Sequence, residues 1–435
     1  MVANNDDLAA VKLWGETVGA IAYEPSTGLC AFQYEPAWLS SGIEISPIKL
    51  PLSNQVYQFP ALPFETYKGL PGAFADTLPD DFGNAVIDAW LARTGRNKDS
   101  FSAVQRLLYT GSRGMGALEY CPAIEKINNS AEPLELDSLV TMAQAVLDQR
   151  DHVKEVLEDD RSQQALTTIL QIGTSAGGAR AKAVIGINQA RSEIRSGQGD
   201  LPKGFKHYLL KFDGVVEHSR SKETFGDPQG YGCMEYAYYL MAKDAGITMM
   251  PSELLHEGDR AHFLTRRFDR LDNEKIHYQS LCAMDHADFK KPGHYSYEQI
   301  FTLMRKLKLS RVEALQMFRR MVFNIVARNH DDHTKNFGFS LSQGGKWALT
   351  PAFDIAYSYK PGSPWVNSHQ ITLNGKRVGF TLADLLVPAA TFHKDALAII
   401  EQVVEVVSQW PRYAKQAGVF PAFSAEIQKA HRLEL

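Results

Sequence analysis

Short stretches of alternating hydrophobic and polar residues follow one another through the first 125 residues, which favours a β-rich amino-terminal subdomain. Residues 12–23 alternate in this way around Gly15 and predict a β-hairpin. Residues 81–94 change to the spacing of an amphipathic helix, so we expect one helix to pack on these strands. The apolar positions of that helix are Phe82, Val86, Ala89 and Trp90.

The middle of the chain mixes helix and strand patterns. Residues 126–133 are polar and turn-prone, and they predict a first domain boundary. Residues 136–170 then read as helical, and two apolar strands with the sequences AVIGI and YLLKF follow. A helix over residues 235–245 and a strand over residues 261–270 come next. We therefore expect residues 126–270 to form a small α/β lobe.

Helix patterns dominate the end of the chain, over residues 296–307, 311–328 and 394–410. A short hairpin interrupts them, with the strands FGFSLS and WALT on either side of the turn QGGK. We expect residues 271–435 to form a helical carboxy-terminal lobe, which makes the whole chain an α+β protein. The last helix carries one apolar stripe at Ala396, Ile399, Ile400, Val403 and Val406.

Composition excludes several classes of protein. The 435 residues are 44% hydrophobic and 22% charged, which is ordinary for a globular protein and excludes collagen or wholesale disorder. The net charge of −4 provides no general attraction for nucleic acid, so any DNA contact would be local or made through a partner. The four cysteines form no CxxC pair, which favours a reducing compartment over a zinc site or a disulfide framework. With no export signal and no run of about 18 apolar residues, we expect a cytoplasmic protein without a membrane span.

The strongest chemical signal is the segment NHDDHTKN at residues 329–336, which directly follows an apolar helix. The predicted hairpin after it returns the chain toward its start, so Asn336 and Asp354 can meet on one side of a cleft. Their oxygen atoms suit a hard cation such as Mg²⁺. Asp331 stands five residues before Asn336, the spacing between the catalytic Asp and the metal-binding Asn of protein kinases. The alternative is a polar helix cap followed by an acidic surface turn, and the choice of Asp331 over Asp332 depends on this spacing alone.

The second signal is the glycine-rich segment GTSAGGARAK at residues 173–182. Its backbone N–H groups could approach phosphates closely, although it does not match the Walker A pattern and a glycine-rich hairpin without function is an equal alternative. Lys211 ends an apolar strand pattern, where burial of the ammonium group is costly unless an anion binds it. An edge-strand position or a side chain that reaches solvent would also explain it.

The order of these parts is more informative than any one of them. A glycine-rich loop, a strand Lys, a helix with Glu235, the segment RRFDR, the Asp331 loop and then Asp354 follow one another as the corresponding parts do in protein kinases. The tripeptide at residues 81–83 spells DFG, but it lies before the glycine-rich loop, so we interpret it as a helix cap and first turn.

Five motifs resemble those of the HipA-type serine/threonine kinases, which are toxins of bacterial type II toxin–antitoxin systems: TLPDDFGN, SAGGARAK, RRFDR, NHDDHTKNFGF and LTPAFDIAYS. The resemblance covers nearly the whole chain. It implies a protein-kinase-like two-lobed fold, with a β-rich N-terminal part that carries the glycine-rich loop and an all-helical C-terminal lobe. It also implies that the chain uses ATP and Mg²⁺.

The resemblance implies a role for each matching residue. Asp331 would be the catalytic base, Asn336 and Asp354 the magnesium ligands, and Ser175 the residue that is autophosphorylated to switch the kinase off, with Thr174 as a rival acceptor. The implied ATP-binding residues are Lys211, Lys182, His333, Ala176, Gly177 and Gly178, with Arg266, Arg267 and Phe268 providing backbone contacts to adenine.

The partners that the resemblance implies are a small helix-turn-helix antitoxin of the HipB type, operator DNA reached mainly through that antitoxin, and a protein substrate in translation such as an aminoacyl-tRNA synthetase. Growth arrest would follow from phosphorylation of that substrate. Two other functions stay open: a catalytically weak ATP-binding scaffold that acts as a co-repressor with the antitoxin, and a small-molecule kinase of the same fold.

Overall fold

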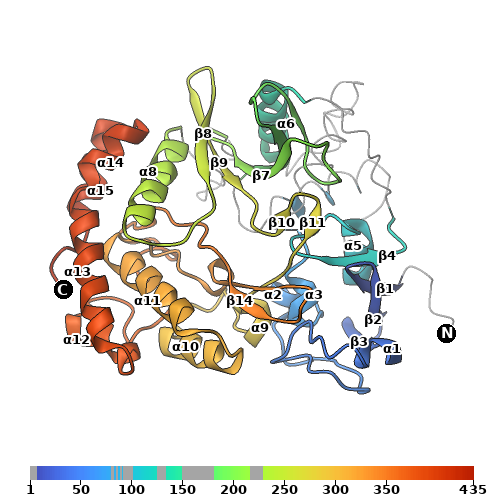
Figure 1. Cartoon of the computed structure of the whole chain (residues 1–435). Coiled ribbons are helices and arrows are strands. Elements are labelled where there is room, and N and C mark those ends of the chain that lie inside the picture. The colour runs from blue at the N-terminus through green and yellow to red at the C-terminus, as the bar shows by residue number, and fades with distance from the viewer. Residues whose placement is uncertain are drawn as a thin grey trace. The chain divides into compact units, whose positions relative to one another are not determined.

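A computed structural model describes residues 7–79, 83–84, 87–88, 91, 101–124, 134–148, 181–215 and 229–435 (Figure 1). The chain divides into two compact units. Unit 1 comprises Met1–Ile45, Leu50–Gly232 and Glu253–Tyr278, and unit 2 comprises Ser46–Lys49, Cys233–Ser252 and Gln279–Leu435. The three-part division expected from the sequence stays a prediction, because its first boundary falls in residues 125–133, outside the described residues.

Unit 1 begins with an antiparallel sheet of strand order β3-β2-β1-β4. The predicted hairpin is confirmed, because β1 and β2 pair around a two-residue turn at Trp14 and Gly15 in which both residues have positive φ. The strands are β1 (Leu8–Leu13), β2 (Glu16–Glu24), β3 (Leu29–Tyr34) and β4 (Leu118–Cys121).

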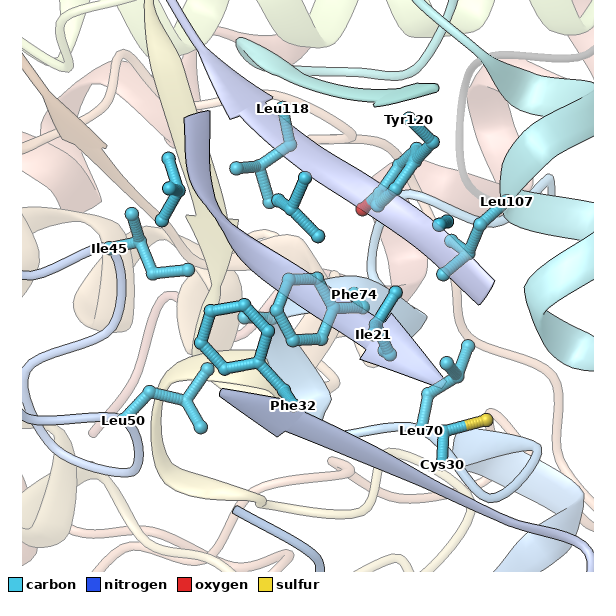
Figure 2. Close-up of a cluster of buried hydrophobic side chains, with 14 of the residues drawn as sticks. Ile21, Cys30, Phe32, Ile45, Leu50, Leu70, Phe74, Leu107, Leu118 and Tyr120 are labelled. Atoms are coloured by element: carbon cyan, nitrogen blue, oxygen red, sulfur yellow. The ribbon is translucent and has the colours of Figure 1, made fainter. Parts of the chain in front are cut away.

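A hydrophobic core lies on this sheet (Figure 2). Phe32 packs against Phe74 with ring centroids 4.8 Å apart, and Leu107 reaches the same cluster from a helix that starts with a capping box between Ser102 and Gln105. The helices that contribute residues to this core are α1 (Pro36–Leu39), α3 (Gly72–Ala75) and α5 (Ala103–Thr110), and the short helix α2 (Phe64–Tyr67) lies between α1 and α3 in the chain.

The second sheet of unit 1 has five strands in the order β6-β5-β7-β9-β8. Its apolar residues form a separate core with Leu139, Val140 and Ala143 of α6 (Leu136–Asp148), the described part of the helix predicted over residues 136–170. The strand predicted over residues 261–270 ends earlier, at Arg266. The strands are β5 (Lys182–Asn188), β6 (Ile194–Ser196), β7 (Phe205–Lys211), β8 (Ser252–Glu257) and β9 (Arg260–Arg266), and a further ribbon pairs β10 (Arg270–Leu271) with β11 (Glu274–Lys275).

Unit 2 is mostly helical. The strongly apolar face of α11 is buried, and so are all five residues of the stripe predicted on α13. The helices are α8 (Tyr231–Asp244), α9 (Leu281–Asp285), α10 (Tyr297–Lys306), α11 (Arg311–Val326), α12 (Leu382–Leu386), α13 (His393–Ser408), α14 (Trp410–Ala417) and α15 (Pro421–Ala430), with 3₁₀ turns η3 (Thr334–Asn336) and η4 (Val387–Ala389).

The carboxy-terminal lobe is not all-helical, which corrects that part of the expectation. The hairpin between FGFSLS and WALT forms as β13 (Gly338–Leu341) and β14 (Trp347–Leu349), and β12 (His277–Ser280) extends it to three strands. The turn residues of QGGK favour a reversal over a continued helix. All four cysteines are free thiols.

Candidate active site

The loop after α11 presents one of its two neighbouring carboxylates to solvent. The Asp331 side chain is 47% exposed, and its Oδ1 lies 3.8 Å from Nε2 of His333. Asn336 folds back and donates from Nδ2 to the backbone oxygen of Asp331 over 2.7 Å. This hydrogen bond therefore joins the two ends of the five-residue segment, and the Asp331 carboxylate lies at the surface of the loop.

Asp332 points the other way, into the protein. Its side chain is fully buried and accepts hydrogen bonds from the Tyr297 hydroxyl at 2.7 Å, the His369 ring at 2.9 Å and the Gln370 backbone N–H at 2.7 Å. Burial by itself would raise the pKa of Asp332, but the charge of His369 and these hydrogen bonds lower it below its ordinary value. Asp332 therefore anchors the loop, and burial as well as spacing now favours Asp331 as the base.

Asp354 is brought to the same loop by hydrogen bonds on both sides of it in the chain. Before it, the Thr350 backbone N–H donates to the Gly338 oxygen at 3.1 Å, across the base of the hairpin. After it, Ser358 forms a parallel bridge with Asn329, at the start of the loop. Asp354 itself has a φ of 52°, a left-handed conformation that costs a non-glycine residue about 1–3 kcal/mol and that concentrates at functional sites.

The residue types here fit a magnesium ion. With its amide nitrogen used in the hydrogen bond to Asp331, Asn336 offers its amide oxygen, and the half-buried Asp354 offers a carboxylate. Within the described residues there is no group of three or more His, Cys, Asp or Glu side chains that could hold a metal. A site of two protein ligands still suits Mg²⁺, since this ion commonly binds one or two carboxylates plus phosphate and water oxygens.

Unit 1 carries a pair of buried lysines. Lys182 of β5 stands directly opposite Lys211 of β7, and the two residues are only 3% and 7% exposed. β7 lies in the middle of the five-stranded sheet, so Lys211 is neither on an edge strand nor reaching solvent. Directly opposite residues of an antiparallel pair lie on the same face of the sheet, where two like charges repel. An arrangement of this kind is suited to binding an anion such as a phosphate group.

The segment proposed to contact adenine is rigidly held. The Arg267 side chain makes two hydrogen bonds to the buried carboxylate of Asp269, and its backbone N–H donates to the His207 oxygen at 3.0 Å. Arg270 also donates to Asp269 at 2.7 Å, and burial lowers the pKa of Arg270 to about 10. Much of the RRFDR motif is therefore an internal ion-pair cluster.

Several predicted residues lie outside the described residues: Thr174, Ser175, Ala176, Gly177 and Gly178 of the glycine-rich loop, and Asp81 and Phe82 of the early DFG sequence. Lys182 is the first residue of β5, so the described chain resumes at the end of that loop.

The sequence did not reveal the residues that hold the loop at residues 329–336 and the start of α8 in place from inside the protein. Tyr297 and His369 hold Asp332 from places about 35 residues away in either direction, and no local signal marks them. Asp213 receives hydrogen bonds from the backbone N–H groups of Gly230 and Gly232 and so fixes the start of α8. Asp213 could have been identified from the sequence as an acidic residue directly after an apolar strand pattern, because burial of its carboxylate requires hydrogen-bond partners.

The chain matches two family models in sequence. The "HipA N-terminal domain" model matches residues 9–121, and the "HipA-like C-terminal domain" model matches residues 174–410, more than half of the chain. The chain belongs to the HipA family. The resemblance stated from the five motifs is thereby confirmed.

Two relatives match the HipA-family chain over most of its length. A protein of Sinorhizobium fredii with the name "Putative kinase Y4mE" is 23% identical over 421 residues, covering 94% of this chain and 86% of the relative. The structure of HipA of Shewanella oneidensis MR-1, solved with HipB and operator DNA, matches with a TM-score of 0.65 at 14% identity, covering 97% of this chain and 95% of that one. The fold is thus that of HipA. Among the helices of the described residues, none is both long and apolar enough to cross a bilayer.

Proposed function

We propose that this HipA-family chain is an ATP- and Mg²⁺-dependent serine/threonine protein kinase that acts as a bacterial toxin. The observation that carries the proposal is the difference between Asp331 and Asp332. The Asp331 carboxylate faces solvent at the kinase spacing from Asn336, whereas the Asp332 carboxylate is buried and anchors the loop. The buried lysine pair adds the phosphate-binding groups that such a kinase needs.

The proposed chemistry is transfer of the γ-phosphoryl group of ATP. Asp331 accepts the proton of a serine or threonine hydroxyl, whose oxygen bonds to the γ-phosphorus while the bond from that phosphorus to the β,γ-bridging oxygen breaks and ADP leaves. Lys211 makes the main phosphate contact, and Lys182 and His333 assist it. Asn336 and Asp354 would hold Mg²⁺, which would neutralise charge on the phosphates. Backbone groups of residues 266–268 and of the loop at Ala176, Gly177 and Gly178 complete the ATP site.

The proposed regulation is autophosphorylation of Ser175 in the glycine-rich loop, with Thr174 as the alternative acceptor. A phosphate group there adds a charge of about −1.5 to −2 beside the anionic nucleotide, and repulsion would empty the site.

The proposed partners follow from the family. The Shewanella oneidensis relative was solved with HipB and operator DNA, which supports a HipB-like antitoxin as the partner of this chain and operator DNA as a contact made mainly through it. The net charge of −4 agrees with an indirect DNA contact. A translation component such as an aminoacyl-tRNA synthetase is the proposed substrate, and the cytoplasm is the proposed location.

Purified protein incubated with γ-labelled ATP and Mg²⁺, alone and with a cell lysate, separates the proposal from its alternatives. We expect self-labelling and a labelled protein band that mass spectrometry can identify. Label found only in small molecules would favour the small-molecule kinase. ATP binding without any transfer would favour the co-repressor scaffold.

A further inference from the structure

The carboxy-terminal segment of residues 430–432 returns to the end of helix α11 in unit 2. The segment comprises the last residue of α15 and the two residues after it. The Arg432 backbone N–H donates to the Val326 oxygen over 2.9 Å. The Arg328 side chain donates from Nε to the Ala430 oxygen over 2.7 Å. The segment is therefore bonded to residues on both sides of the helix end.

The residue between these two contacts is reached through a buried tyrosine. The Tyr238 hydroxyl of α8 donates to the Ala327 oxygen over 2.6 Å and lies 3.0 Å from Nε2 of His431. Burial raises the pKa of Tyr238 and lowers the pKa of His431 to about 3, so the phenol keeps its proton and the imidazole is neutral near pH 7. His431 therefore donates from Nε2 to the Tyr238 oxygen. The fully buried Trp410 packs edge-on against both rings.

These contacts satisfy backbone groups that a helix leaves open. The last carbonyl oxygens of an α-helix have no N–H partner within the helix, so they need donors from elsewhere. At the end of α11, Arg432 provides the donor for Val326, and Tyr238 provides the donor for Ala327. Both donors are distant in sequence, so tertiary contacts fix the point at which the chain leaves α11.

Arg328 turns the chain from α11 into the catalytic loop of residues 329–336. Its φ of 58° is a left-handed conformation, which a non-glycine residue keeps only with support from its surroundings. The guanidinium group bonds to Ala430 and lies over the Tyr359 ring, with Cζ 4.7 Å from the ring centre. Asp331 follows three residues later in the chain. The direction that the chain takes at Arg328 therefore affects where the Asp331 carboxylate lies.

We propose that residues 430–432 position the catalytic loop for phosphoryl transfer, with Arg328 and Tyr238 as the positioning residues that they bind. This inference rests on the proposed kinase function, because it concerns the loop that carries the base, Asp331. The match to the HipA-like C-terminal domain ends at residue 410, so the inference comes from the contacts of this chain and not from that match.

Loss of these contacts should act on the rate of transfer more than on ATP binding. A catalytic group that moves by about 1 Å can lose about 10²-fold in rate. Lys211, the main proposed phosphate contact, belongs to β7 and is not part of the catalytic loop. We therefore expect the KM for ATP to change far less than kcat when residues 430–432 are detached.

The first test removes one donor of the segment. Arg432→Pro removes the N–H that binds Val326, and His431 already has the extended backbone, with φ −56° and ψ 145°, that a residue before proline prefers. In the full-length protein, kcat is measured as the maximal rate of label transfer from γ-labelled Mg-ATP to protein, per folded molecule. We expect it to fall about five-fold or more, with the KM for ATP within about two-fold of the wild type.

Two further variants serve as controls for this substitution. Arg432→Ala keeps the backbone N–H and loses the bond from the side chain to the Phe380 oxygen, so we expect a smaller loss of kcat, below about two-fold. Glu434→Pro places the same residue at an exposed position further along the chain and should keep the wild-type kcat.

The second test uses the left-handed conformation of Arg328. Arg328→Ala and Arg328→Gly both remove the bond to Ala430, but glycine adopts a positive φ without support. If the contacts act by holding this turn, the kcat of Arg328→Gly should be about three-fold or more above that of Arg328→Ala. The same low kcat in both variants, per folded molecule, would contradict this role of the turn.

Three other outcomes overturn the inference and leave the kinase function standing. An unchanged kcat in Arg432→Pro, with a lower unfolding midpoint, would make residues 430–432 a stabilising segment only. A higher KM for ATP without a change in kcat would assign the segment to nucleotide binding. Equal losses in Arg432→Pro and Glu434→Pro would assign the effect to proline itself and not to the lost donor. Absence of transfer by the wild type would overturn the proposed function itself.

Discussion

Asp332 has the surroundings of a structural residue, and its replacement tests that role. Asp332→Asn keeps the shape but replaces one accepting oxygen with an NH₂ group that faces the donors of His369 or Gln370. Leaving buried donors without an acceptor costs about 1–3 kcal/mol, so we expect the thermal unfolding midpoint to fall. Phosphoryl transfer per folded molecule should fall much less than in Asp331→Asn. A fully stable Asp332→Asn protein with no transfer would instead make Asp332 the base.

Asp354, the second proposed magnesium ligand, has a left-handed backbone conformation that needs support from the surrounding fold. We expect Asp354→Ala to weaken binding of Mg-ATP more than Asp331→Asn does, because it removes a ligand of the cation and not the base. Calorimetric titration of both variants measures this. Equal and unchanged affinities would remove the ligand assignment, and Asp354→Ala should leave binding of magnesium-free nucleotide nearly as it is in the wild type.

At the scale of an element, strand β7 offers a matched pair of lysines for testing the phosphate site. Lys211 is buried opposite Lys182, whereas Lys206 on the same strand is 40% exposed and pairs with Asp272. Lys211→Met should abolish most of the rise in unfolding midpoint that Mg-ATP gives the wild type, because a ligand stabilises the folded state only as far as it binds. Lys206→Met should keep that rise. Loss of the rise in both variants, or in neither, would contradict the role of Lys211.

The glycine-rich loop is the element proposed to carry the switch. After incubation with Mg-ATP, we expect phosphopeptide mapping to find a phosphate on Ser175 in the wild type and none in Asp331→Asn, and the phosphorylated form to bind ATP more weakly. A phosphate on Thr174, or a phosphorylated protein that binds ATP normally, would contradict this proposal.

Local pattern was enough to predict several elements but not the contacts between them. The hairpins and the buried stripe of α13 follow from residues close in sequence, so their periodicity revealed them. The burial of Asp332 depends on Tyr297 and on residues 369–370, which only the folded chain brings together. The pairing of Lys182 with Lys211 likewise depends on the register between β5 and β7. A slip of one residue in that register would separate the two lysines.

For the whole molecule, the residues named in the proposal are distributed over both units. Lys182 and Lys211 belong to unit 1, and Asp331, Asn336 and Asp354 belong to unit 2. The order of motifs along the chain was therefore a better guide to function than any single motif, because parts scattered over residues 173–354 agree with one mechanism. The family match over both segments of the chain supports the same conclusion.

The central claim is that this chain transfers phosphate from ATP with Asp331 as the base, and one measurement tests it most directly. Full-length wild type and Asp331→Asn are compared for the rate of label transfer from γ-labelled Mg-ATP to protein, with ATP affinity measured on the same samples. We expect transfer by the wild type, a loss of about 10²-fold or more in Asp331→Asn, and ATP affinities within a few-fold of each other. Equal transfer rates for the two proteins, or ATP binding by the wild type with no transfer to any protein, would contradict the account.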